Sequence, residues 1–133
     1  MRGRKPELKA IEGGLARLPP APPWLPAEAK AEWRRVTAAL KGRRTITKAD
    51  LPMLESYCLA AGTVRRMQAT IATDGDHITT GKGEVKRHPA FQTLFQALTE
   101  SRRLAAELGL TPASRNKATP TDVSDDELSG LDL

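Results

Sequence analysis

The chain is poor in the residues that most often form cross-links, bind metals or carry out catalysis. It has a single cysteine, Cys58, so an internal disulfide is impossible. The only two histidines, His77 and His88, lack the neighbours that a metal site needs, which argues against zinc binding. No serine, cysteine or carboxylate pair has an activating neighbour along the sequence. We therefore expect a protein that is not an enzyme and has no catalytic residue, no metal and no cofactor.

Aromatic residues and long apolar runs are also scarce. Phe, Trp and Tyr make up 4% of the chain and hydrophobic residues 39%, so the core is expected to be small and aliphatic. Association with further copies would help such a core. Cys58 lies in an apolar helical pattern, which favours a buried structural thiol. No run is long enough for a membrane helix and none has the form of a signal peptide, so we expect a soluble, intracellular protein.

The charge of the chain is unevenly distributed. The 21 basic and 16 acidic residues give a net charge of +5. Residues 1–24 carry a net +3, residues 25–115 a net +6 and residues 116–133 a net −4. A basic body favours a polyanionic partner, and an acidic tail favours a separate role for that segment. Charge alone leaves a plain solvated surface open as the alternative.

Hydrophobic spacing predicts a mainly α fold of three helices. They are expected over about residues 26–41, 47–73 and 89–108, each with an apolar face, and the first two are expected to run antiparallel. Between the second and the third, residues 77–80 and 84–87 flank a Gly-rich turn and predict a β-hairpin or hairpin-like loop. The stretch 75–83 superficially suggests a phosphate-binding loop, but its glycine spacing and its Gly83 do not fit, so nucleotide binding is excluded.

Local signals predict where the helices begin and end. Thr47 and Asp50 make a near capping box at the start of the second helix, and His88 is expected to cap the third. Gly109 can take the left-handed conformation that ends a helix. Thr111, followed by a proline, should then cap a new turn.

These signals divide the chain into three parts. Residues 1–25 are interpreted as a flexible, basic, proline-rich arm that ends in an extended hinge. Residues 26–115 are interpreted as the helical core and oligomerisation domain. Residues 116–133 are interpreted as an acidic, disordered tail whose spaced leucines could form an amphipathic helix on a partner.

Three groups of basic residues are candidates for contact with DNA. The arm around Gly3 has the pattern of a minor-groove binder, with arginines for the negative groove and proline to keep the chain extended. A second group, which also includes Lys41, crowds the first interhelical turn and is interpreted as phosphate contacts rather than base readers; a charged face that keeps the protein soluble is the alternative. A third projects from the hairpin, where it could equally serve to discourage edge-to-edge aggregation. The candidates are Arg2, Arg4, Lys5, Lys9, Arg34, Arg35, Arg43, Arg44, Lys48, Lys82, Lys86 and Arg87.

Several motifs resemble, in order, those of the small terminase subunits of tailed phages. The most specific is residues 102–115, which reads RRLAAELGLTPASR and follows a helix that opens with His88-Pro89-Ala90. The resemblance extends upstream over most of residues 1–115. It includes the motifs Gly3-Arg4-Lys5-Pro6, Pro22-Pro23-Trp24-Leu25, Thr47-Lys48-Ala49-Asp50 and Tyr57-Cys58.

The resemblance implies a DNA-packaging role in the cytoplasm of a phage-infected bacterium. Small terminase subunits form rings of about eight to ten copies, as closed cyclic symmetry allows. They recognise viral double-stranded DNA at the packaging start site and bring it to the large subunit, which holds the ATPase and nuclease. The acidic tail would repel DNA, so it suits a basic patch on the large subunit. The candidate contacts are Asp125, Asp126, Glu127, Leu128, Leu131 and Leu133.

Two other non-enzymatic functions fit the same sequence. One is a small dimeric DNA-binding regulator, which would associate in pairs rather than rings. The other is a phage head-completion protein, which would bind the portal or capsid and have little affinity for DNA. A metal-dependent nuclease ranks last, since its carboxylates would have to be assembled from separate parts of the chain.

Overall fold

The protein is described here by a computed structural model that covers residues 10–117. The elements in order are α1 (Ala27–Ala39), a 3-10 turn (Lys48–Asp50), α2 (Leu51–Asp74), β1 (His77–Thr79), β2 (Val85–Arg87), α3 (Ala90–Glu107) and α4 (Pro112–Lys117). The mainly α fold, with three long helices and a two-stranded hairpin, is confirmed. The helix ends differ from the expected bounds by a few residues, because terminal turns are the least specified part of a helix.

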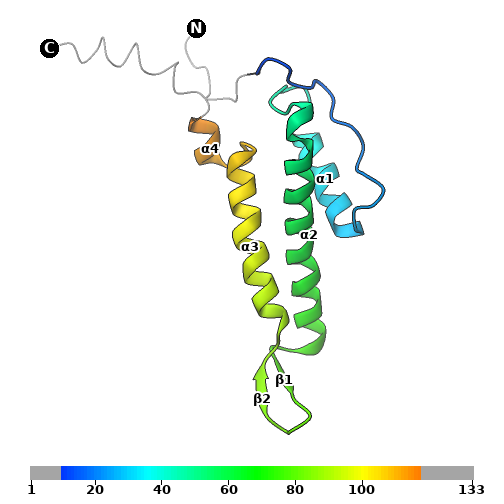
Figure 1. The fold of residues 1–133 in the computed structure, drawn as a ribbon, viewed down its shortest axis with the longest axis vertical. Coiled ribbons are helices and arrows are strands. Elements are labelled where there is room, and N and C mark those ends of the chain that lie inside the picture. Colours follow the sequence, from blue (N-terminus) through cyan, green and yellow to red (C-terminus); the bar gives the residue numbers. More distant parts are fainter. Residues whose placement is uncertain (1–9, 118–133) are drawn as a thin grey trace, which may run out of the picture.

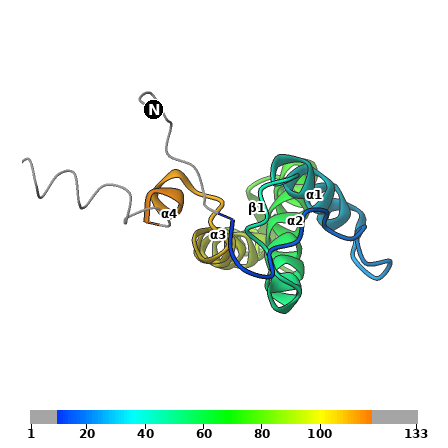
Figure 2. The same ribbon diagram turned by 90° about the horizontal axis from the view of Figure 1, so that it is seen from above.

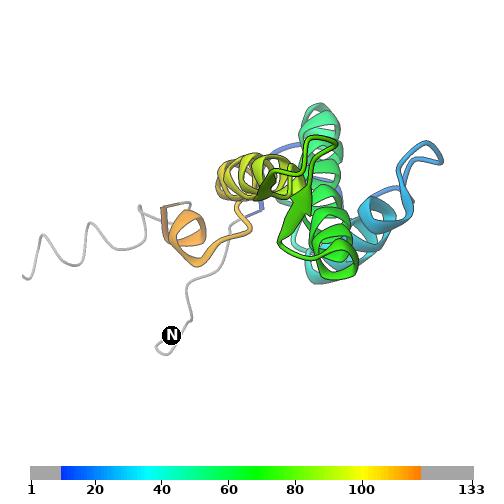
Figure 3. The same cartoon turned by 90° about the horizontal axis from the view of Figure 1, so that it is seen from below.

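The three long helices lie side by side, with α2 in the middle (Figure 1). Views along the long axis show α1 on one side of α2 and α3 on the other (Figures 2 and 3). The hairpin projects beyond the end where α2 leads into α3, while the α1–α2 loop and α4 lie towards the opposite end. The molecule therefore has two distinct ends, which are joined by the paired helices α2 and α3.

The main core lies where α1 packs against the first half of α2. Ala29, Trp33 and Val36 of α1 are buried, as are Leu40 directly after it and Leu54, Tyr57 and Cys58 from α2. The predicted burial of the Cys58 thiol is confirmed. Burial also raises the pKa of this thiol to about 12, so it stays protonated and unreactive near neutral pH.

Gly62 allows α1 and α2 to approach closely. A Cβ atom at this position would lie 2.8 Å from the backbone nitrogen of Ala29. From sequence, a glycine in mid-helix only weakens the helix. In the fold it is the residue whose missing side chain lets the start of α1 lie against α2.

Only half of the apolar stripe on α3 is covered. Leu94, Ala97 and Leu108 are buried. Phe95 is 49% exposed and Leu98 36% exposed. The sequence pattern puts Leu94, Phe95, Leu98 and Leu108 on one face, but α2 is the main neighbour of α3 in the described structure and covers only its near side.

Side-chain caps fix the helix starts as predicted. The Asp50 carboxylate accepts hydrogen bonds from the backbone N–H of Thr47 (2.9 Å) and from its hydroxyl (3.0 Å). At the start of α3, His88 Nδ1 accepts a hydrogen bond from the backbone N–H of Ala90 (3.0 Å). Thr111 Oγ1 accepts one from the backbone N–H of Ser114 (3.1 Å) at the start of α4. Gly109, with φ of 75°, ends α3 in the left-handed conformation expected of it.

The hairpin is short and regular. β1 and β2 are antiparallel, with His77 opposite Arg87 and Thr79 opposite Val85. The Thr80 hydroxyl accepts a hydrogen bond from the backbone N–H of Glu84 (3.2 Å), which closes the turn. Every residue of β2 is exposed, so the hairpin presents one bare strand to solvent.

Candidate nucleic-acid interface

The segment before α1 is bonded to the loop between α1 and α2. The N–H of Ile11 donates to the carbonyl of Arg44 (3.1 Å), and the N–H of Leu15 donates to the carbonyl of Ile46 (2.8 Å). The sequence predicted a flexible, basic arm that ends in an extended hinge over residues 1–25. Backbone hydrogen bonds instead fix the path of the described part of that range, because the α1–α2 loop offers free carbonyl groups along it.

Gly14 is the point of closest approach between this segment and the loop. A Cβ atom there would lie 1.9 Å from the carbonyl oxygen of Arg44, so no residue with a side chain fits this path. Arg44 itself has φ of 57°, the left-handed region that non-glycine residues seldom adopt. The backbone of Arg43 and Arg44 is therefore held in a defined conformation. The first hydrogen bond that holds it comes from Ile11, two residues after Lys9.

The cations predicted around the α1–α2 turn do gather at one end of the molecule. Arg34 lies on α1, Arg43 and Arg44 in the loop and Lys48 in the 3-10 turn, and all are exposed. Lys82 and Lys86 are exposed on the hairpin, towards the other end (Figure 1). Within the described residues, the predicted DNA contacts therefore lie in two separate groups, one around the α1–α2 turn and one on the hairpin.

Arg35 differs from its neighbours because its guanidinium is already paired. Its Nε and Nη2 donate to the two carboxylate oxygens of Glu32, at 2.9 Å and 2.6 Å. The Tyr57 hydroxyl donates to the same carboxylate at 2.6 Å. Glu32 is 4% exposed. The triad of Glu32, Arg35 and Tyr57 therefore joins α1 to α2 at the edge of the core. Contact between Arg35 and DNA stays a prediction, and it would compete with this pairing.

The pKa shifts in the triad follow from burial and these bonds. Burial alone would raise the pKa of Glu32, but hydrogen bonds from Arg35 and Tyr57 outweigh it and hold that pKa below its usual value. The bond to Glu32 raises the pKa of Arg35. Burial, and next the bond to Glu32, raise the pKa of Tyr57 to about 12. The triad is thus an ionised carboxylate held by a cation and a neutral phenol.

Arg87 on the hairpin also has close neighbours. Its guanidinium carbon lies 5.4 Å from the centre of the Phe91 ring and 5.6 Å from that of Phe95. A guanidinium over aromatic rings at these distances makes a cation–π contact. Arg87 therefore links the hairpin to α3, whereas Lys82 and Lys86 have no such contact with an aromatic ring in the described range.

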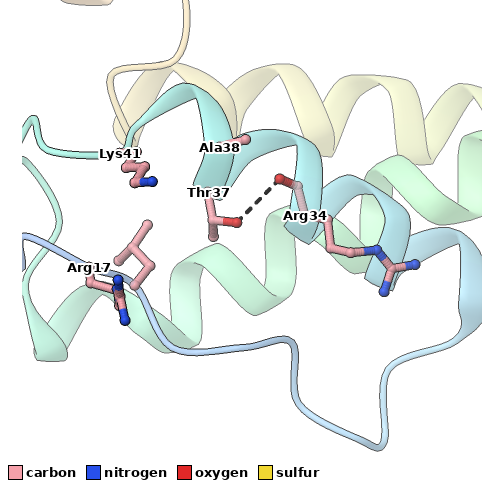
Figure 4. A pocket seen from close by; sticks show the side chains of 6 residues that line it. Arg17, Arg34, Thr37, Ala38 and Lys41 are labelled. Atoms are coloured by element: carbon pink, nitrogen blue, oxygen red, sulfur yellow. Dashed lines mark hydrogen bonds between the residues drawn. The ribbon is translucent and has the colours of Figure 1, made fainter.

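Sequence reasoning missed Arg17. It lines a hollow of about 250 Å³ together with residues from α1 (Figure 4). The lining residues are Arg17, Leu18, Arg34, Thr37, Ala38 and Lys41. The spacing of Arg34, Thr37, Ala38 and Lys41 places them on one stripe of a helix and marks the α1 side of the hollow, but no sequence signal places Arg17 beside it.

Both ring nitrogens of His88 have a partner within the fold. His88 Nε2 lies 2.9 Å from the Asp74 carboxylate, and its other ring nitrogen caps α3. Residues 10–117 contain no group of three histidine, cysteine or acidic side chains that could hold a metal ion. Within the same range, no helix is both long and apolar enough to cross a membrane.

Comparison with known proteins places the chain in a family. A family model described as "Phage terminase, small subunit" matches residues 29–125, which is more than half of the chain. The chain belongs to this family. No curated protein and no solved structure matches it.

Membership in the terminase small-subunit family gives the chain a general role in phage DNA packaging. Members of the family are in general non-catalytic and associate with DNA and with the large terminase subunit. Some predicted contacts lie outside the described residues: Arg2, Arg4, Lys5 and Lys9 in the arm, and Asp125, Asp126, Glu127, Leu128, Leu131 and Leu133 in the tail.

Proposed function

We propose that this chain is the DNA-recognition and regulatory component of a phage packaging motor. It binds viral DNA at the packaging start site, recruits the large subunit and modulates its ATPase and nuclease. The match of residues 29–125 to the small-subunit family carries this proposal. The exposed cations around the α1–α2 turn support it, because the basic arm joins the described structure beside them.

Neutralising the arm should flatten the salt dependence of DNA binding. Replacing Arg2, Arg4, Lys5 and Lys9 with glutamine removes groups that would release counterions from DNA. For every phosphate that the arm no longer neutralises, the slope of log affinity against log salt should fall by about 0.9. Fluorescence anisotropy with duplex DNA over a salt series measures this slope. An unchanged slope would exclude the arm from DNA binding.

A matched control uses two pairs of arginines. Arg65 and Arg66 are exposed on α2, away from the α1–α2 turn. Replacing both with glutamine removes the same charge as replacing Arg2 and Arg4. We expect the α2 pair to leave the slope unaltered and the arm pair to lower it.

The acidic tail is proposed to bind the large subunit. Removal of residues 118–133 leaves every described element in place and removes the acidic groups and leucines. Affinity for the large subunit should fall at least tenfold if these contacts carry binding, since a tenfold loss corresponds to only about 1.4 kcal/mol. Binding to DNA should persist. Calorimetric titration with the large subunit tests this, and equal affinity of the two forms would refute it.

Self-association into a ring of about eight to ten copies is the third part of the proposal. The uncovered stripe on α3 supports contact with a second copy, because Phe95 and Leu98 are exposed there and Val85 on β2 is 69% exposed. A ring multiplies weak phosphate contacts through effective concentration.

Phe95→Asp should lower the subunit number, whereas Gln96→Asp, on a neighbouring exposed position, should not. Native mass spectrometry measures both. A dimeric wild-type protein would favour the small DNA-binding regulator instead. A protein without DNA affinity that binds the portal or capsid would favour the head-completion protein.

A further inference from the structure

The hollow beside α1 is lined by cations of two separate segments. Arg17 comes from the segment before α1, and Arg34 and Lys41 come from α1 and the residues that directly follow it (Figure 4). No acidic residue lines the hollow, and none of these three cations has an ion pair within residues 10–117. Figure 4 shows the Arg34 guanidinium extending along α1, away from Arg17 and Lys41, so the charges nearest to an anion placed in the hollow are those of Arg17 and Lys41.

Specific hydrogen bonds place Arg17 opposite the α1 stripe. On one side of it, the N–H of Gly42 donates to the carbonyl of Ala16 (3.3 Å). On the other side, Trp33 Nε1 donates to the carbonyl of Pro19 (2.9 Å). Trp33 is 2% exposed and cannot shift without disturbing the core. The backbone around Arg17 is therefore held on one side by the turn after α1 and on the other by α1 itself, and its position does not depend on the Arg17 side chain.

The chemistry of the lining fits a phosphodiester group. An arginine presents planar paired donors that match phosphate oxygens, and a lysine adds a point charge. The Thr37 hydroxyl donates to the carbonyl of Arg34 (3.2 Å), while Leu18 and Ala38 contribute no competing acceptor side chain. The volume of about 250 Å³ is several times the ~30 Å³ share of a water molecule, which leaves room for a phosphate group.

A backbone phosphate of DNA is a better occupant than a small free anion. Arg17, Arg34 and Lys41 are all exposed, so the hollow opens to a large ligand. Lys41 leads directly through Gly42 to Arg43 and Arg44, which extends the positive surface beyond the hollow. A polyanion can bridge this whole run, whereas a free phosphate ion can occupy only the hollow.

We propose that this hollow is a seat for a phosphate of the DNA backbone and that Arg17 is a DNA-contacting residue. The inference rests on the proposed function and adds a specific place on the protein to it. Arg17 holds the phosphate oxygens, Lys41 supplies further charge, and Arg34 lies at the edge of the hollow. Because phosphates carry no base identity, the seat positions the protein on DNA without reading sequence.

Single-charge variants test the seat against a control of equal charge. Arg17→Ala and Lys41→Ala remove lining cations, and Arg66→Ala removes an exposed cation from α2. Binding of the full chain to a mixed-sequence duplex is measured by anisotropy across a salt series. Each lining variant should weaken binding about five- to tenfold and lower the salt slope by about 0.9, as expected for one phosphate contact. Arg66→Ala should change neither.

A charge-preserving variant separates charge from geometry. Arg17→Lys keeps the charge but loses the paired donors, so its affinity should lie between those of the wild type and Arg17→Ala. Equal thermal unfolding of all variants is expected, because the bonds at Ala16 and Pro19 use backbone carbonyls.

The outcomes distinguish this seat from the proposed function. If the wild type binds DNA and Arg17→Ala behaves like Arg66→Ala, the seat is refuted while DNA binding stands. If the wild-type chain shows no salt-dependent binding to duplex DNA, both the seat and the DNA-binding part of the proposed function fail.

Discussion

Replacing Trp33 with alanine is expected to lower the free energy of unfolding by about 3–5 kcal/mol. Trp33 is among the largest fully buried side chains of the described structure and is only 2% exposed. Its removal leaves a cavity between α1 and α2 and also breaks the bond from its indole N–H to the carbonyl of Pro19. The total free energy of unfolding of a small domain is about 5–15 kcal/mol, so this one change removes much of the stability.

The chain supplies its own control for this experiment. Trp24 is the same residue type but is 60% exposed. Trp24→Ala should change the free energy of unfolding by no more than about 0.5 kcal/mol. Urea denaturation followed by circular dichroism measures both variants. If Trp24→Ala and Trp33→Ala lowered the free energy of unfolding by similar amounts, Trp33 would not be buried between α1 and α2 as described.

Replacing Glu32 with glutamine should cost about 2–3 kcal/mol near neutral pH. The change removes the charge that holds Arg35 through two hydrogen bonds, while the amide can still accept one from Tyr57. The cost stays below that of breaking a fully buried ion pair, because the Arg35 side chain is 59% exposed and can return to water.

Acid should remove the difference between the wild type and Glu32→Gln. The pKa of Glu32 is lower in the folded chain than its unfolded value of about 4.3. A carboxyl group with a depressed folded pKa contributes its full stability above the unfolded pKa and loses it as the pH falls through the folded pKa. Urea denaturation should therefore show a large difference in the free energy of unfolding between the wild type and Glu32→Gln at neutral pH, and a small difference in acid.

An exposed carboxylate provides the comparison for the acid experiment. Glu12→Gln, outside any helix or strand, should have an effect within about 0.5 kcal/mol at either pH. A Glu32→Gln difference that persists undiminished in acid would show that the ionised carboxylate is not what stabilises the triad.

Local signals in the sequence were enough to predict the helices and their caps. Residues three or four positions apart lie on the same face of a helix. The spacing of apolar residues therefore located α1, α2 and α3 without any tertiary information. The bonds at Asp50, His88 and Thr111 span two to three residues, and residue types at that range specify them. Short sequence motifs also carried the family resemblance, which the family match confirms.

Glu32 shows where periodicity was insufficient. Its position falls on the buried face of α1 between Ala29 and Trp33, so a carboxylate in an apolar stripe was visible in the sequence. Its partner Tyr57 lies 25 residues away, and only the packing of α1 on α2 brings the two side chains together. The pattern could mark Glu32 as unusual but could not predict that Tyr57 would donate a hydrogen bond to its carboxylate.

The sequence by itself determined a helical, basic body and a family of DNA-packaging proteins, because spacing, caps and charge are properties of neighbouring residues. Tertiary structure decided which cations stand together. It brought Arg17 to the hollow that Arg34 and Lys41 also line, paired Arg35 with Glu32, and placed the hairpin cations at the far end. These arrangements depend on contacts between distant segments, such as Gly14 with Arg44 and Gly62 with Ala29, which no local pattern encodes.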